Sequence, residues 1–193
     1  MALAAVACAV AEGWVAKGKG RGRAVELFCG SGMAGVAARS AGYDVTDVFD
    51  TKGTARMMAK RVYPEAKVWA TSVWNVKEVL KNIMATKEQV RLILACPPCP
   101  PFTPSSIHMG RDERAELVTR TVDVFLRSGA QSMVMENVKG MRRAAVWQVA
   151  KRRLQAAGFE VDPALGLVFD PVDGTFSLSA DARVNYALVA RKG

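Results

Sequence analysis

Short hydrophobic runs alternate with longer amphipathic segments along most of the chain. Runs rich in Val, Leu, Ile and Phe predict strands, and the segments between them, with apolar residues at helical spacing, predict helices. The predicted strands cover residues 24–28, 44–49, 67–70, 90–95, 131–136, 165–169 and 183–190, and the predicted helices cover 33–41, 52–62, 75–86, 112–128 and 144–157. This alternation predicts an α/β fold, a mostly parallel sheet with helices on both faces.

The first residues follow a different pattern. Residues 2–13 are Ala-rich and predict a helix, and VAKGKGRGR at 15–23 is basic and Gly-rich, as in flexible connections. We therefore expect an N-terminal helix and linker at 1–22 and one domain at 23–193. The apolar start has no basic n-region and breaks at Glu12, so secretion is not expected. No apolar run approaches the roughly 18 residues that a membrane span needs, so we expect no membrane partner.

The loops that follow the predicted strands are the places to look for a site. In open α/β sheets, ligands bind beyond the carboxyl ends of the strands. We expect one shared crevice to be formed by the loops at 29–32, 50–52, 71–74, 96–106 and 137–143.

The first of these loops is rich in glycine. In ELFCGSGMAG at 26–35, Gly30, Gly32 and Gly35 allow a tight turn and close approach of a ligand to the backbone. Asp50 ends the second strand, where a carboxylate can accept hydrogen bonds from ribose hydroxyls. The motif suits either a dinucleotide or S-adenosylmethionine, and a purely structural glycine turn also remains open.

The fourth predicted strand runs into CPPCPPFTP at 96–104. Its prolines stiffen the loop and hold Cys99 at the carboxyl edge of the sheet, where a nucleophile would be presented. The C-x-x-C spacing with Cys96 also allows a redox dithiol. A zinc site, and any other metal site, is not expected, because the chain has one histidine, His108, and otherwise isolated cysteines.

A third segment, MENVKG at 135–140, follows the fifth predicted strand. It places Glu136 at a strand end next to the Cys99 loop. A carboxyl group there can donate a proton to a ring nitrogen, which is what nucleophilic attack on a base requires.

Together these segments resemble the cytosine-5 DNA methyltransferase family. Its hallmarks F-x-G-x-G, P-P-C-Q-P-F-S/T and E-N-V correspond in order to FCGSG at 28–32, PPCPPFT at 97–103 and ENV at 136–138. RDERAEL at 111–117 resembles the family's D-x-R-x-x-L helix start. The resemblance covers roughly residues 24–190 and implies a Rossmann-like, S-adenosylmethionine-dependent methyltransferase fold.

The resemblance also implies roles for residues in cofactor binding. Phe28 would pack on the adenine, Gly30 and Gly32 would approach the methionine part, and Asp50 would bind the ribose. Ser72 stands where the family has an acidic residue facing the adenine amine.

The catalytic residues implied by the resemblance are Cys99, Glu136 and Arg183. Cys99 would add to carbon 6 of a flipped cytosine while Glu136 protonates nitrogen 3, which activates carbon 5 for methylation. Pro100 replaces the family's usual Gln. The late Q-x-R-x-R motif corresponds to SADAR at 179–183, which keeps Arg183 but has Asp181 at the first arginine position.

Charge and cysteine content complete the expectations. With 27 Lys and Arg against 18 Asp and Glu, the net charge is +9 and the pI about 9.7, which favours a polyanionic partner such as DNA or RNA. Four cysteines make no disulfide framework for a domain of this size, so we expect an intracellular protein of the cytoplasm or nucleus. No target-recognition region follows residues 183–190, and we expect a second polypeptide to carry it.

Three other functions remain open at this stage. The chain could be a catalytically weak, methyltransferase-like subunit that binds nucleic acid or assists a partner, as Asp181 and the lack of a recognition region suggest. It could also methylate cytosine in RNA. A nicotinamide oxidoreductase is supported only by the glycine motif and leaves CPPCPPF and ENV unexplained.

Overall fold

The computed structural model describes residues 20, 22–103, 112–169, 176–179 and 185–192. The N-terminal helix predicted at 2–13 lies outside the described residues, as does Arg183. No helix among the described residues is long and apolar enough to cross a membrane.

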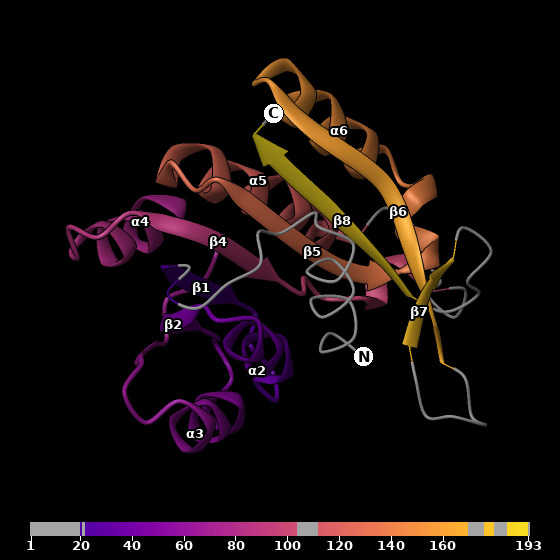
Figure 1. The fold of residues 1–193 in the computed structure, drawn as a ribbon. Helices are drawn as coiled ribbons and strands as arrows, with labels where there is room; N and C mark the ends of the chain where they lie inside the picture. Colours follow the sequence, from indigo (N-terminus) through magenta and orange to yellow (C-terminus); the bar gives the residue numbers. More distant parts are fainter. Residues whose placement is uncertain (1–19, 21, 104–111, 170–175, 180–184, 193) are drawn as a thin grey trace.

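One mixed sheet runs through the molecule (Figure 1). Its strands are β1 (Arg23–Leu27), β2 (Asp44–Phe49), β3 (Lys67–Trp69), β4 (Val90–Ala95), β5 (Ser132–Val138), β6 (Phe159–Phe169), β7 (Phe176–Ser179) and β8 (Asn185–Lys192), in the order β3-β2-β1-β4-β5-β8-β6-β7. Strands β1 to β5 pair in parallel. β8 lies antiparallel to both β5 and β6, so β6 runs in the same direction as β5, and β7 adds an antiparallel edge.

Helices cover both faces of this sheet. Successive side chains of a strand point to opposite faces, and the central strands are buried along nearly their whole length, so both faces must be covered. The helices are α2 (Met33–Ser40), α3 (Gly53–Val62), α4 (Val76–Met84), α5 (Leu117–Ser128) and α6 (Ala145–Ala156). Ile93 of β4 and Met133 of β5 belong to the core cluster with α4, α5 and α6, whereas Leu92 and Val134 pack with α2 and α3. The predicted α/β architecture is confirmed.

A buried ion pair connects the first strands below the crevice. Arg23 and Asp47 each have about 1% of their side chain exposed and lie 2.6 Å apart. Arg23 also donates to the Ile83 carbonyl of α4, and the Trp69 indole of β3 donates to Asp47. Removing one partner would leave an uncompensated buried charge, so the pair fixes β1, β2, β3 and α4 relative to one another.

The main differences from the predicted elements lie after residue 158. β6 begins at Phe159 rather than at 165, and β7 was not predicted. The sequence of β6 contains Pro163 and Gly166, which indicate a break, but the pairing of β6 with β8 shifts register between Asp162 and Leu165. An irregularity of this kind accommodates a proline, so the strand continues through it.

Candidate active site

The loops at the carboxyl ends of the strands surround a cavity of about 540 Å³. Four of the five residues predicted for cofactor binding, Phe28, Gly30, Asp50 and Ser72, are among its lining residues, and Gly32 is not. Cys96, Pro98 and Pro100 of the proline-rich loop line the other side, and Arg114 comes from the RDERAEL segment. The structure therefore brings the glycine loop and the Cys99 loop to one crevice.

Asp50 ties two of these loops together. Its Oδ2 accepts from the Gly30 N–H at 3.0 Å, and its Oδ1 accepts from the Lys52 N–H at 2.8 Å. The backbone at Phe28 has a φ of 57° and that at Gly30 a φ of 52°, both left-handed. A non-glycine residue seldom adopts this conformation outside functional turns, so Phe28 marks a constrained position at the mouth of the cavity.

Gly32 lies beneath the loop. It is buried at the start of α2 with a φ of 80°, and its carbonyl accepts a hydrogen bond from the Tyr63 hydroxyl. A Cβ added at Gly35 would lie 2.5 Å from the Tyr63 hydroxyl and 2.7 Å from Glu26 Oε2. The glycines at 32 and 35 thus let Tyr63 and Glu26 pack directly under the loop that forms the crevice.

Glu26 is a buried carboxyl group that the sequence did not single out. Burial raises its pKa from 4.5 to about 7, whereas the nearby Gly35 N–H and Tyr63 hydroxyl oppose the rise and the Asp50 charge adds to it. Its Oε2 has no hydrogen-bond partner among the described residues. Glu26 also lines a smaller cavity of about 160 Å³, which shares Phe28, Gly30 and Cys96 with the larger one.

Two contacts hold the Cys99 loop against the end of β5. The fully buried Asn137 donates from Nδ2 to the Pro97 carbonyl at 2.9 Å. A Cβ added at Gly140 would lie 1.9 Å from the Phe102 carbonyl oxygen, so the turn after β5 and the short 3-10 turn η1 (Pro100–Phe102) pack backbone to backbone. Asn137 and Gly140 both belong to the MENVKG segment at 135–140. These two contacts therefore explain why this segment and the CPPCPPFTP segment lie in one site.

The three described cysteines differ in acidity. Interaction with the Cys96 side chain lowers the pKa of Cys99, although burial and the Glu136 charge oppose this. The pKa of Cys96 is raised because its thiol interacts with Cys99, is buried and lies beside Glu136. Burial raises the pKa of Cys29 to about 12. Cys99 is therefore the described cysteine best suited to act as a thiolate nucleophile.

Glu136 lies at the end of β5 beside this loop, with 7% of its surface exposed. The Cys96 thiol donates to its Oε2 at 2.8 Å. Cys96 and Cys99 are both free thiols, and the described residues contain no cluster of three or more metal-ligating side chains. Neither Cys99 nor Glu136 is among the lining residues of the 540 Å³ cavity, but Cys96 and Pro98 of the same loop are. A thiol and a carboxyl group thus lie next to the cavity, and these are the groups needed to attack and protonate a heterocycle.

Sequence reasoning missed Glu26 and the role of Asn137, and it considered Cys96 only as half of a C-x-x-C pair. Cys96 carried a signal, because it stands in the same motif as Cys99, at the end of β4. Asn137 also carried a signal, as the second residue of the ENV segment, although its contact with Pro97 could not be read from it. Glu26 gave none, since its importance depends on burial against segments distant in sequence.

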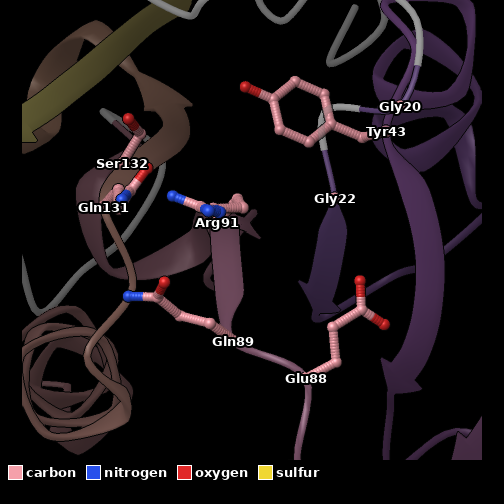
Figure 2. A pocket seen from close by; sticks show the side chains of 8 residues that line it. All are labelled: Gly20, Gly22, Tyr43, Glu88, Gln89, Arg91, Gln131 and Ser132. Carbon is pink, nitrogen blue, oxygen red and sulfur yellow. The ribbon is translucent and has the colours of Figure 1, made fainter.

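A second cavity, of about 360 Å³, lies at the opposite, amino end of the strands. The side chains of Arg91, Gln131 and Ser132 gather on one side of it and Tyr43 on the other (Figure 2). None of the described residues that line this cavity carries a thiol, and ligands of open α/β sheets bind at the other edge. We therefore assign the chemistry to the carboxyl edge.

Comparison with known sequences agrees with this geometry. The model of the C-5 cytosine-specific DNA methylase family matches residues 22–167. The type II methyltransferase M.AgeI of Thalassovita gelatinovora is 26% identical over 145 residues, which make up 72% of this chain and 34% of that protein. The chain thus spans about a third of the length of this curated relative.

Comparison with solved structures gives the same fold. A DNMT2 variant of Spodoptera frugiperda has a TM-score of 0.64 at 22% identity, covering 88% of this chain and 50% of that one. A putative DNA modification methyltransferase from an E. coli prophage has a TM-score of 0.68 at 18% identity, covering 88% and 46%. A TehB-like SAM-dependent methyltransferase of Corynebacterium glutamicum has a TM-score of 0.52 at 14% identity, covering 97% and 88%.

The crevice suits S-adenosylmethionine, the cofactor of this group of enzymes. Its volume of about 540 Å³ lies in the range of small-molecule sites, and it combines the Phe28 ring, the Asp50 carboxylate and the backbone of the glycine loop. The family match extends over more than half of the sequence and includes the Gly30 loop, Cys99 and Glu136. The chain belongs to the C-5 cytosine-specific DNA methylase family.

Proposed function

We propose that this chain transfers a methyl group from S-adenosylmethionine to carbon 5 of cytosine in DNA, through a covalent adduct with Cys99. The observation that carries the proposal is the arrangement at the ends of β4 and β5. There, Cys99, whose pKa is lowered, and Glu136, which accepts the Cys96 hydrogen bond, lie together beside the Asp50 cavity.

In this proposal the cofactor occupies the 540 Å³ cavity. Phe28 packs on the adenine, Asp50 binds the ribose, and the Gly30 loop approaches the methionine part. Ser72, whose hydroxyl accepts from the Trp74 N–H at 3.3 Å, takes the place of a carboxylate near the adenine amine. When bound, S-adenosylmethionine supplies an electrophilic methyl group, which the activated carbon 5 takes up.

The residues of the chain activate the base. The Cys99 thiolate forms a bond to carbon 6, and the ring electrons move toward carbon 5 while Glu136 holds a proton at nitrogen 3. After methylation, carbon 5 loses its proton to a base, the electron pair re-forms the double bond, and the carbon–sulfur bond to Cys99 breaks. Arg183, assigned from the sequence pattern, would hold the cytosine carbonyl.

The proposed substrate is DNA with the target base flipped out of the duplex, at a cost of a few kcal/mol. The net charge of +9 favours contacts with phosphate groups. Two exposed arginines can make such contacts: Arg152 in α6 and Arg143 just before it. Such contacts position a protein without distinguishing sequences. Recognition of a target sequence is therefore proposed to come from a second polypeptide.

An incorporation experiment tests this proposal. The chain is incubated with labelled S-adenosylmethionine and either DNA of mixed sequence or transfer RNA, with and without candidate partner polypeptides. We expect label in DNA cytosine, and a DNA containing 5-fluorocytosine should trap the wild-type protein but not Cys99→Ser. The serine variant should keep its affinity for the cofactor, because only the nucleophile has changed.

Other results would change the assignment. Label in RNA but not DNA would identify the RNA methyltransferase that the sequence leaves open. Cofactor binding without transfer under every condition would favour the catalytically weak subunit, for which the serine at position 72 and the aspartate at 181 are the supporting features. Cycling of a Cys96–Cys99 disulfide with substrate would instead support a redox function.

A further inference from the structure

Cys96 lies where the parts of the site meet. Its backbone N–H donates to the Leu27 carbonyl of β1 at 3.3 Å, which fixes the end of β4 against β1. It lines both the 540 Å³ cavity and the smaller 160 Å³ cavity. Its thiol faces the side chains of Glu136 and Cys99. A residue at this position can affect the acid and the nucleophile together.

The orientation of the Glu136 carboxylate depends on its hydrogen bond with the Cys96 thiol. The hydrogen bond from Cys96 to Oε2, at 2.8 Å, is the one that orients the carboxylate among the described residues, and Oε1 has no partner there. A carboxylate on a flexible side chain must be held in place to meet a ring nitrogen, because small misplacements lower reaction rates steeply. Cys96 thus leaves one oxygen of Glu136 available while it holds the other.

The same thiol influences the nucleophile. The pKa of Cys96 is raised by its contact with Cys99, by burial and by Glu136, so Cys96 keeps its proton, and its side chain in turn lowers the pKa of Cys99. One thiol carries one proton, so it can donate to Glu136 or to Cys99 at any moment, but not to both. In the structure the Cys96 proton is directed at Glu136 Oε2, and the Cys99 thiol donates to the Pro97 carbonyl at 3.9 Å.

We propose that Cys96 is a positioning residue for methyl transfer, whose thiol holds Oε2 of the Glu136 carboxylate in place and leaves Oε1 for the base. This inference rests on the proposed function. It gives the first cysteine of the CPPC segment a role that needs neither a disulfide nor a metal. A hydroxyl at the same position should perform it, whereas an alkyl group of similar size should not.

Two variants separate the donor from the side-chain volume. Cys96→Ser keeps a donor, and Cys96→Val fills similar space without one. The first measurement is the rate of alkylation of Cys99 by iodoacetamide as a function of pH, with the modified residue located by mass spectrometry. The second is kcat and KM for methyl transfer to DNA, and the third is S-adenosylmethionine affinity by calorimetry. The alkylation arm requires no activity, so it separates failure of this inference from failure of the proposed function.

For Cys96→Val, we expect the alkylation midpoint of Cys99 to move to higher pH and kcat to fall roughly ten- to a hundredfold, the usual effect of losing a hydrogen bond to a charged group. KM and cofactor affinity should change little, and Cys96→Ser should restore most of both losses. Wild-type alkylation and kcat in Cys96→Val would overturn the proposal. Equal losses in the serine and valine variants would also overturn it, since they would show that the donor is not what matters.

Discussion

Glu26 offers a test of the structure that does not depend on activity. Its carboxyl group is buried under the glycine loop with one oxygen unpartnered, and its pKa is raised to about 7 chiefly by burial. Replacing it with glutamine, as in Glu26→Gln, keeps the shape of the protonated acid and removes its ionisation. The pH dependence of stability should then differ between the two proteins.

The sign and size follow from proton linkage. Below pH 4.5 the carboxyl group is protonated in both the folded and the unfolded state, and its contribution to stability is fully present. As the pH rises from about 4.5 to about 7, the unfolded state releases the proton while the folded state keeps it, so wild-type stability falls. One pH unit corresponds to about 1.4 kcal/mol, so the interval amounts to about 3 kcal/mol.

The assay is urea unfolding followed by circular dichroism, at pH values from 4.5 to 8.5, for wild type and Glu26→Gln. The free energy of unfolding of the variant, relative to wild type, should increase by up to about 3 kcal/mol up to pH 7 and then stay constant. Glu65→Gln, which removes an exposed carboxylate, is the control for the loss of one negative charge. Parallel pH profiles for wild type and Glu26→Gln would refute the burial of an ionisable group at this position.

Three further predictions concern other contacts. Asp47→Ala, which leaves a buried arginine unpaired, should lower the free energy of unfolding by about 3 to 5 kcal/mol in urea, whereas Lys81→Ala in an exposed pair should cost less than about 1 kcal/mol. Gly140→Ala should displace the Cys99 loop, since its Cβ would overlap the Phe102 carbonyl, and should slow Cys99 alkylation in the mass-spectrometric assay. Asp50→Ala should weaken S-adenosylmethionine binding by about 1 to 3 kcal/mol in calorimetry, and an unchanged affinity would contradict its assigned role.

The sequence predicted the fold class because alternating strands and helices leave a strong local signal. Ranges such as the strands at 44–49 and 90–95 agree with the structure residue for residue. The convergence of the glycine loop and the Cys99 loop also followed from the sequence, since the carboxyl ends of parallel strands meet at one edge. The position of β8 between β5 and β6 could not be predicted, because it depends on which strands pair in the sheet rather than on local composition.

The finer features of the site arise from contacts between distant segments. Glu26 lies in a strand whose sequence does not indicate that Tyr63 will cover it. Cys96 and Glu136 are joined by a hydrogen bond across neighbouring strands, and the same spacing of Cys96 and Cys99 suits a redox pair equally well. In the structure the Cys96 thiol donates to Glu136 Oε2 and the Cys99 thiol to the Pro97 carbonyl, contacts that the spacing of the two cysteines does not indicate.

The position of β8 has a consequence for synthesis of the protein. On the ribosome, β6 emerges before β8, although β8 is the strand that lies between β5 and β6 in the sheet. Translation proceeds at roughly 5 to 20 residues per second, so the nascent chain passes through a state in which β5 and β6 both have an open edge on the side that β8 will occupy. Open edges of this kind pair readily with other chains. Residues 185–192 therefore end a period of exposure to aggregation when they insert between the two strands.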